Sequence, residues 1–241
     1  ITTKVVKNGV RQFTGTDRTN FFTNLYDHDI PAAGTPLREA TISVGEYFKR
    51  TDDQGPWGQT PGSTGGTQHE CRQNFNILMT DGYWTEGSIS GMDNSDNQSG
   101  STITNDSSPA TPASYTYSPS SPYSDAYSDT LADVAMHYWK NDLRTDMLNK
   151  VPTNAHDPAF WQHLVNFTVG LGVTGSLSSL PSGSGSWPDP TTSDAAKIDD
   201  LWHAAVNSRG SFFSASDPAT FSNALSNALS AIVARTGAAS A

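Results

Sequence analysis

Apolar residues recur with a helical period early in the chain, which predicts an amphipathic helix with one buried face. The residues of this face stand on one helical stripe: Leu37, Ala40, Val44, Tyr47 and Phe48. The preceding Thr35-Pro36 indicates the helix start, because Thr35 can accept a hydrogen bond from a first-turn N–H and Pro36 lies where its missing donor is harmless.

The same period predicts three later helices. One opens at residues 130–133, where Thr and Asp have the spacing of a capping box. Another covers residues 198–206 and stops before Gly210, and a last one follows Asp217-Pro218. The opening segment, residues 13–26, contains aromatic pairs, but no period assigns it to a helix or a strand.

Three apolar segments predict strands. Residues 75–79 form a short apolar run that ends at a Thr-Asp-Gly turn, and residues 164–173 are rich in β-branched and aromatic side chains before they run into glycines. Residues 211–214 form a third, shorter strand. Strands that alternate with helices predict an α/β fold whose parallel sheet is covered on both faces.

The segment 85–129 differs from the rest of the chain. It is dominated by Ser, Asn, Asp, Thr, Pro and Tyr and has no helical or alternating period. Such a composition predicts a long surface loop inserted between a strand and a helix. It would be ordered only where other parts of the chain hold it.

Charge and composition narrow the classes of function. The 241 residues carry 14 Lys and Arg against 24 Asp and Glu, a net charge of −10, which argues against a surface for nucleic acid or for an anionic membrane. No stretch approaches the roughly 18 apolar residues of a membrane helix. The start at Ile1 has no initiator Met and no signal-like segment, so we expect it to be a cut end. Low Lys with abundant Ser, Thr, Asn and Gly indicates an exported protein.

Motifs for catalysis are absent or incomplete. The glycine run 170–175 follows a strand, as in a dinucleotide fingerprint, but no helix start follows it, so a glycine-rich strand exit is favoured over a nucleotide site. There is no Gly-x-Ser-x-Gly elbow, and His69-Glu70 lacks the second histidine of a zinc protease. The histidines at 137, 163 and 203 stand beside apolar or aromatic residues, which favours structural roles. We therefore expect no enzymatic activity.

A cation site is the strongest chemical candidate. Asp81 ends a predicted buried strand, and open α/β sheets bind ligands beyond the carboxyl ends of their strands. Its carboxylate and the Thr35 hydroxyl are hard oxygen donors suited to Mg²⁺ or Ca²⁺. The alternative is that Asp81 only forms a turn and Thr35 only caps a helix, and spacing does not decide between the two.

Regional charge slightly favours the cation. Between Arg72 and Lys140 there is no Lys or Arg, and a cation would meet a negative field there. This stretch holds eight acids: Asp81, Glu86, Asp93, Asp96, Asp106, Asp125, Asp129 and Asp133.

Several segments together resemble the later two thirds of a von Willebrand factor A domain. They are Gly34-Thr35-Pro36-Leu37, Ile77-Leu78-Met79-Thr80-Asp81-Gly82, Phe167-Thr168-Val169-Gly170-Leu171-Gly172 and the closing Phe212-Phe213 strand with its Ala- and Leu-rich helix. The resemblance implies a doubly wound α/β fold with a mainly parallel sheet and a strand order of 3-2-1-4-5-6. It implies a partial A-type domain over residues 1–241, with the loop at about 85–129 as an insertion.

More narrowly, three strings of the chain resemble the PilY family, the type IV pilus tip adhesins and assembly factors of Gram-negative bacteria. These strings are residues 71–84, 130–135 and 198–207, and the likeness runs from about residue 9 to the end. The resemblance implies a non-enzymatic role in pilus assembly and in attachment to a surface or host cell. The partners would be the minor-pilin complex of the pilus tip and a surface or host receptor. The protein would be exported to the pilus tip, the cell surface or the outer membrane.

The resemblance also implies roles for the two candidate ligands. In integrin-type A domains a metal ion-dependent adhesion site holds a divalent cation. Thr35 matches the loop threonine that ligates the metal, and Asp81 matches the aspartate that reaches it directly or through water. The first motif of the family, Asp-x-Ser-x-Ser, is absent, and the similar Glu86-Gly-Ser-Ile-Ser string follows the strand of Asp81 instead of preceding it.

We therefore expect the chain to be a piece of a longer protein, whose preceding part supplies the first strand and its motif. Cys71 is the single cysteine, and in an oxidising periplasm it is expected to pair with a cysteine outside this chain. The alternative function from another class is a structural, mechanically loaded spacer domain with a vestigial cation site.

Overall fold

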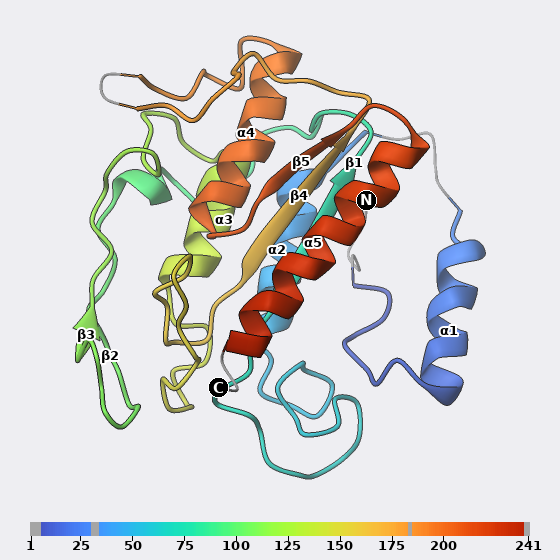
Figure 1. Cartoon of the computed structure of the whole chain (residues 1–241), viewed down its shortest axis with the longest axis vertical. Helices are drawn as coiled ribbons and strands as arrows, with labels where there is room; N and C mark the ends of the chain where they lie inside the picture. Colours follow the sequence, from blue (N-terminus) through green and yellow to red (C-terminus); the bar gives the residue numbers. More distant parts are fainter. Residues whose placement is uncertain (1–5, 30–33, 183–184, 239–241) are drawn as a thin grey trace.

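A parallel three-stranded sheet forms the centre of the computed structural model, which describes residues 6–29, 34–182 and 185–238 (Figure 1). Its strands are β1 (Phe75–Thr80), β4 (Val165–Leu171) and β5 (Phe212–Ala215), in the order β1-β4-β5. Both strand pairs are parallel, with Phe75 opposite Val165 and Thr168 opposite Phe212. The predicted α/β fold with a mainly parallel sheet is confirmed, and all three predicted strands are present.

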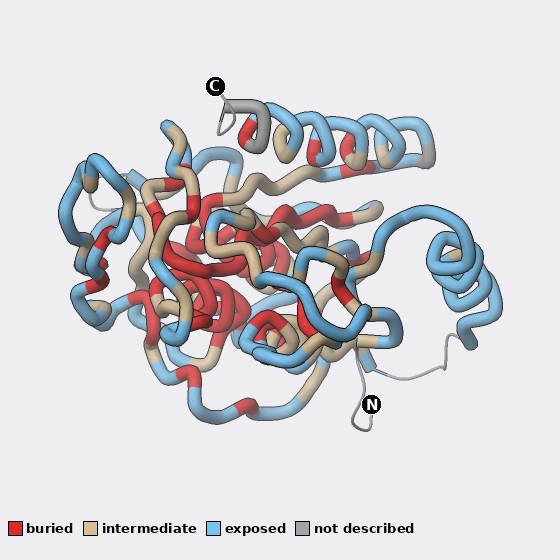
Figure 2. Tube along the Cα trace, turned by 90° about the horizontal axis from the view of Figure 1, so that it is seen from below, coloured by how far each residue is buried: buried red, intermediate tan, exposed pale blue. Residues whose placement is uncertain are grey.

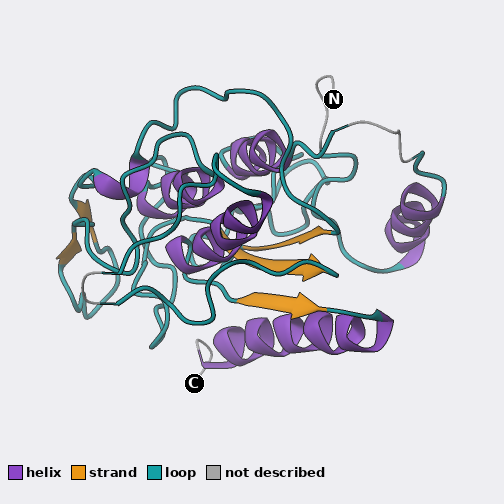
Figure 3. Ribbon diagram, turned by 90° about the horizontal axis from the view of Figure 1, so that it is seen from above, coloured by secondary structure: helices purple, strands orange, loops and turns teal. Residues whose placement is uncertain are grey.

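Helices cover both faces of this sheet (Figure 3). On one face lie α2 (Leu37–Phe48), α3 (Leu131–Lys140) and α4 (Asp194–Asn207), and on the other lies α5 (Pro218–Ala238). The central strand β4 is buried from Val165 to Gly170 because both of its faces are covered, which is why its sequence is apolar without alternation. The four helices predicted from the periodicity are thus all present.

The buried face of α2 differs from the stripe of apolar residues that the sequence predicted. Three residues of that stripe are only half-buried: Ala40, Val44 and Tyr47. The buried face instead includes Thr41 and Gly45, because the Tyr138 ring of α3 lies directly on α2 at Gly45. A Cβ at Gly45 would stand 2.4 Å from that ring, so the close approach of the two helices requires glycine there.

The two predicted helix starts have different outcomes. At α3, Thr130 accepts a hydrogen bond from the Asp133 N–H and the Asp133 carboxylate accepts one from the Thr130 N–H, so the predicted capping box is confirmed. At α2, the residue before the first turn is Pro36, and no side chain caps the helix. The prediction that Thr35 caps α2 is therefore wrong, since only its backbone carbonyl accepts the Leu37 N–H.

The segment 85–129 is more than a surface loop. It contains a single turn of 3₁₀ helix, η1 (Ser95–Asn97), and a short antiparallel ribbon of β2 (Ile103–Thr104) and β3 (Ser114–Tyr115). Ile103 and Tyr117 are buried in an aromatic cluster with Trp139 of α3. The predicted loop is thus held in place by α3, against which it buries apolar residues of its own.

The opening segment, which the sequence left unassigned, contains the helix α1 (Gly15–Tyr26). No residue of α1 is buried, and the helix lies apart from the body of the protein (Figure 2). Upstream of it, Val10 donates its N–H to the Tyr47 hydroxyl at 2.7 Å, which holds the segment to α2. Along its outer edge, β1 pairs with no strand of the described residues.

Candidate cation site at the carboxyl end of the sheet

Asp81 directly follows β1 and is exposed to solvent. The turn at this point is closed by Thr80, whose hydroxyl donates to the Gly82 carbonyl at 3.0 Å and accepts from the Gly82 N–H at 3.2 Å. Within the described residues, the Asp81 carboxylate makes no hydrogen bond and no ion pair. The Asp81 side chain therefore takes no part in holding the turn and is free to bind a ligand.

Thr35 lies at the same end of the sheet, just before α2. Its N–H donates to the Thr85 hydroxyl at 2.6 Å, and its carbonyl accepts from the Thr85 N–H at 3.0 Å. These two bonds fix Thr35 to a residue only four positions beyond Asp81. Thr35 is thus joined to the segment that follows Asp81, and the Thr35 hydroxyl makes no hydrogen bond with any residue that is described.

The Glu86 string that resembles the missing motif is used for another purpose. Glu86 forms an ion pair with Arg38 at 3.2 Å, and both side chains are 7% exposed. Arg38 also donates to the Asp129 carbonyl, and its guanidinium stacks 3.8 Å from the centre of the Trp84 ring. These contacts tie the start of α2 to the segment after β1, so Glu86 already has a cationic partner in the protein.

The eight acids counted in the sequence do not gather around Asp81. Glu86 pairs with Arg38, Asp133 closes the capping box of α3, and Asp106 accepts the Asn149 N–H. The regional charge therefore supports a cation at Asp81 less than the sequence indicated, because partners from distant elements use several of these carboxylates.

A buried carboxylate closes the amino end of α3. Asp200 of α4 accepts hydrogen bonds from the N–H groups of Leu131 and Ala132 at 3.0 Å each, and from the Trp84 indole at 2.9 Å. Burial raises the pKa of Asp200, and the three donors oppose this shift. One side chain thereby joins α4, α3 and the segment after β1, and the first N–H groups of α3 are occupied by the protein itself.

The glycine run does not form a nucleotide site. Among the described residues between Gly175 and α4, no helix begins, and the N–H groups of Ser176 and Leu177 donate to the Asp199 carboxylate. A Cβ at Gly175 would stand 2.0 Å from an Asp199 oxygen. The glycine run therefore lacks the helix N-terminus that a dinucleotide site needs, and Gly175 allows the loop to approach α4.

The structural role expected for His163 is confirmed. Its Nε2 lies 2.9 Å from the Asp157 carboxylate and its Nδ1 lies 2.6 Å from the Trp161 carbonyl, so both ring nitrogens face acceptors. Burial alone would lower the pKa of His163, but the Asp157 carboxylate outweighs it and the pKa is raised. Burial would raise the pKa of Asp157, but its interaction with His163 holds that pKa below its usual range.

We expect the stability contributed by His163 to fall as the pH rises. A raised pKa means that the folded protein binds the proton more tightly, so the contribution is complete below the ordinary value of 6.5 and is lost as the pH passes the higher folded value. Urea unfolding of wild type and His163→Gln at about pH 5.5 and about pH 8.5 checks this. The free energy difference between the two proteins should shrink at the higher pH, whereas an equal difference at both would contradict the charged pair.

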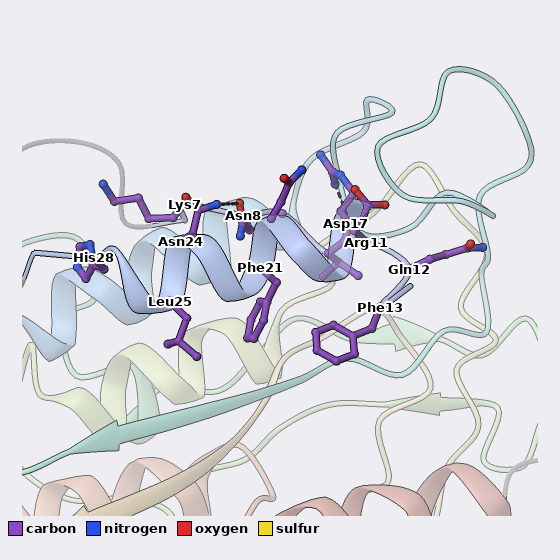
Figure 4. Close-up of a pocket in the computed structure, with 13 residues that line it drawn as sticks. Lys7, Asn8, Arg11, Gln12, Phe13, Asp17, Phe21, Asn24, Leu25 and His28 are labelled. Carbon is purple, nitrogen blue, oxygen red and sulfur yellow. Dashed lines mark hydrogen bonds between the residues drawn. The ribbon is translucent and has the colours of Figure 1, made fainter. Parts of the chain in front are cut away.

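A groove of about 830 Å³ lies on the opening segment and is lined by residues 7–28 (Figure 4). Phe13, Phe21 and Leu25 point to the same side of the segment, and their exposed fractions are 56%, 42% and 56%. Asn24 donates to the Asn8 side chain at 2.8 Å along the other side. This groove offers apolar contact area and has no cluster of catalytic groups.

Sequence reasoning missed one group of side chains. Asp96, Asp125 and His203 each place a carboxylate oxygen or a ring nitrogen within 4.8 Å of the others. Burial raises the pKa of Asp96 to about 6, although His203 opposes the shift. Burial also raises the pKa of Asp133 to about 8, and the neighbouring Asp96 adds to that shift. In the sequence, Asp96 and Asp125 are two of the eight acids between Arg72 and Lys140. Nothing in the sequence links these two aspartates to a histidine of α4.

Comparison with known proteins tests the predicted resemblance to the PilY family. The chain is 39% identical over 241 aligned residues to the type IV pilus biogenesis factor PilY1 of Pseudomonas aeruginosa strain PAK, which covers 88% of this chain and 20% of that protein. PilY1 of strain UCBPP-PA14 is 34% identical over 261 aligned residues, covering 95% of this chain and 21% of that protein. The predicted resemblance to the PilY family is confirmed.

The PilY resemblance covers nearly all of this chain, which spans about a fifth of the length of the curated relatives it matches. No family model matches the chain, and no solved structure matches it. Among the described residues, no helix is long and apolar enough to cross a membrane. Cys71 is exposed and is not bonded to another cysteine of this chain, so its pairing with an outside cysteine stays a prediction.

Proposed function

We propose that this chain is a non-enzymatic component of a type IV pilus-associated adhesin, contributing to pilus assembly and to attachment to a surface or host cell. Its similarity to proteins named type IV pilus biogenesis factor PilY1 supports the role in the pilus. The partners would be the minor-pilin complex at the pilus tip and a receptor on the surface or host. The protein would be exported and would act at the pilus tip, cell surface or outer membrane.

Attachment would use a metal ion-dependent adhesion site in which Thr35 and Asp81 ligate Mg²⁺ or Ca²⁺. One observation carries this proposal: the exposed Asp81 carboxylate has no partner among the described residues and stands at the carboxyl end of β1, beside the segment that holds Thr35. Carboxylate and hydroxyl oxygens are the ligands that these hard cations prefer. A ligand of the receptor could complete the coordination of the metal.

The preceding part of the same protein would complete this site. The outer edge of β1 is unpaired among the described residues, and Met79 of this strand is 47% exposed. A parallel strand added there would end at the same edge as Asp81 and would bring further ligands to it. The exposed Phe13, Phe21 and Leu25 would supply apolar contacts beside it. We expect an Asp-x-Ser-x-Ser motif in that strand, and the sequence of the parent protein tests this.

Substitution of Asp81 tests the adhesion site. In a polypeptide that includes the preceding strand, we expect Asp81→Ala to weaken Mg²⁺ or Ca²⁺ binding about tenfold or more while the melting temperature stays unchanged, because the exposed side chain contributes no packing. Thr35→Ala should behave in the same way, since its side chain does not cap α2. Calorimetric titration with Mg²⁺, Mn²⁺ and Ca²⁺, alongside thermal melts, measures both quantities.

Asp52→Ala serves as the matched control, because Asp52 is an exposed acid beyond the other end of α2. Piliated cells that carry Asp81→Ala should lose attachment, and cells that carry Asp52→Ala should keep it. If wild type and Asp81→Ala bind cations equally, the adhesion site is wrong and a spacer domain with a vestigial site takes its place.

A further inference from the structure

The imidazole of His203, on α4, faces two aspartates of the segment 85–129 through opposite ring nitrogens. Its Nδ1 atom lies 3.5 Å from a carboxylate oxygen of Asp125, and its Nε2 atom lies 3.6 Å from one of Asp96. The three side chains are between 0% and 3% exposed. Nε2 also lies 2.7 Å from the Tyr123 carbonyl. Both nitrogens are therefore directed at oxygen atoms of the segment.

These oxygen atoms determine which form of the ring fits between them. A carbonyl oxygen only accepts hydrogen bonds, so Nε2 carries a hydrogen that it donates to Tyr123. In a neutral imidazole Nδ1 then has a lone pair, which repels the Asp125 carboxylate. In the imidazolium Nδ1 also carries a hydrogen, and the contact with Asp125 becomes an ion pair. Protonation of His203 therefore changes this contact from repulsion to attraction.

An aromatic ring covers the imidazole. The Trp187 ring stacks on that of His203 with 4.2 Å between centroids and 13° between planes. A cation is attracted to the face of an indole, and the attraction is stronger where water is excluded. The Trp187 indole N–H donates to the Pro122 carbonyl at 2.7 Å, so Trp187 contacts both His203 and the segment. The stack favours the imidazolium and keeps its nitrogens directed at the segment.

No lysine or arginine in the described part of the chain forms an ion pair with Asp96 or Asp125. Lys140 of α3 donates to two backbone carbonyls in and beside η1, and Arg209 donates to two carbonyls at the end of α4. His203 is the cationic partner within 4 Å of both carboxylates. Buried charge is costly unless it is paired, so a neutral His203 leaves two buried carboxylates uncompensated.

Two further buried acids adjoin the cluster. Asp133 of α3 accepts the Asp96 N–H at 3.3 Å, and Asp200 lies one turn before His203 on α4. Burial raises the pKa of Asp96 to about 6 and that of Asp133 to about 8, and it also raises the pKa of Asp200. Burial raises the pKa of Tyr117 as well, so its hydroxyl remains a neutral donor to the Asp96 carbonyl.

The acids and the histidine respond to pH in the same direction. An acid with a raised pKa destabilises the folded state as it ionises, so the stability of the cluster is highest below the ordinary value of 3.8. This stability falls as the pH rises through the raised values of Asp96 and Asp133. Loss of the proton from His203 removes the compensating charge. A rise in pH therefore weakens the cluster through each of these groups.

We propose that protonation of His203 holds residues 120–127 against α4 and that loss of this proton releases them. At acidic pH the imidazolium joins α4 to both aspartates. As the pH rises, the ring loses the Nδ1 proton, and repulsion at Asp125 opens the contact. Ile103 and Tyr117 stay packed against α3, so the release is confined to the part of the segment around Asp125. This device is separate from the cation site of the proposed function and uses none of its residues.

Hydrogen exchange followed by mass spectrometry tests the release. The exchange of residues 120–127 is compared at about pH 5.5 and about pH 8.5, after correction for the intrinsic pH dependence of amide exchange. In the wild type we expect protection to be at least about tenfold lower at the higher pH. His203→Gln should have low protection already at the lower pH, because its side chain carries no charge. Equal protection of the wild type at both pH values would overturn the proposal.

Asp125→Asn keeps the test decisive if His203→Gln does not fold. The substitution replaces the oxygen nearest Nδ1 with an N–H donor, which can bond to the neutral ring, and the remaining amide oxygen still accepts the Tyr127 N–H. We therefore expect Asp125→Asn to keep residues 120–127 protected at the higher pH. If this variant loses protection there as the wild type does, the contact with Nδ1 does not control the segment.

His156→Gln is the matched control, because His156 is exposed and the substitution is the same. This variant should keep the pH dependence of the wild type. A flat profile in His156→Gln would contradict the proposal, since the dependence would then not belong to His203.

Nitrogen NMR reads the protonation of the ring itself. The wild-type protein is labelled with ¹⁵N in its six histidines, and the signals that change in Asp125→Asn identify His203. We expect this ring to be an imidazolium at about pH 5.5 and to have lost the Nδ1 proton at about pH 8.5. The same protonation state of His203 at both pH values would overturn the proposal.

Discussion

Asp200→Ala should lower the free energy of unfolding by about 3 kcal/mol, one of the two largest effects that we expect from a single substitution. The substitution leaves three buried donors without their acceptor: the N–H groups of Leu131 and Ala132 and the Trp84 indole. Each buried donor that loses its partner costs about 1–3 kcal/mol. Removal of the desolvation cost of the carboxylate, which burial imposes on Asp200, offsets part of this sum.

Urea unfolding followed by circular dichroism measures this loss. Asp194→Ala is the matched control, because Asp194 lies on the same helix with a side chain that is 56% exposed, and its replacement should change the free energy by less than about 1 kcal/mol. Asp200→Asn should fall between the two, since the amide keeps one acceptor oxygen. A loss below about 1 kcal/mol in Asp200→Ala would mean that water replaces the carboxylate at the start of α3.

Gly210→Ala should also destabilise the protein by about 3 kcal/mol, because the added methyl group meets backbone that cannot move aside. A Cβ at Gly210 would stand 1.8 Å from the Asn166 carbonyl oxygen of β4. Relieving this overlap requires α4 and β4 to move apart, and overpacking of this kind costs about 1–3 kcal/mol and occasionally more. Thermal and urea unfolding measure the effect.

Gly82→Ala and Gly87→Ala provide the same chemical change without the overlap, because a Cβ at either position meets nothing within 4 Å. Both should be neutral or stabilising by up to about 1 kcal/mol, since alanine restricts the unfolded chain. If Gly210→Ala is as stable as these controls, then α4 can shift on the sheet and the close contact is not required for the fold.

The sequence determined the elements of the fold because the patterns that predict helices and strands are local in the chain. Hydrophobic period, a capping box at 130–133 and apolar runs ended by turn residues predicted four helices and three strands, and all are present. The same strings carried the resemblance to the PilY family, which the PilY1 relatives confirm. Asp81 could be placed at the carboxyl end of a strand because a strand end is visible in the sequence itself.

The tertiary structure decided how these elements fit together. Gly210 was predicted as a helix stop, but the positive φ of 64° belongs to Arg209, and Gly210 is required by its contact with β4. In the same way, Gly45 belongs to the buried face of α2 only because the Tyr138 ring lies on it. The local sequence does not show which residue of another element will lie close to a given position.

The candidate functional residues also differ in whether the sequence alone reveals them. Thr35 and Asp81 were found from the sequence, since each adjoins the end of a predicted element. Asp96, Asp125 and His203 were not found, because up to 107 positions separate residues whose side chains nearly touch. Their distribution along the chain resembles ordinary surface acids and a structural histidine, and only the packing of the 85–129 segment onto α4 brings them together.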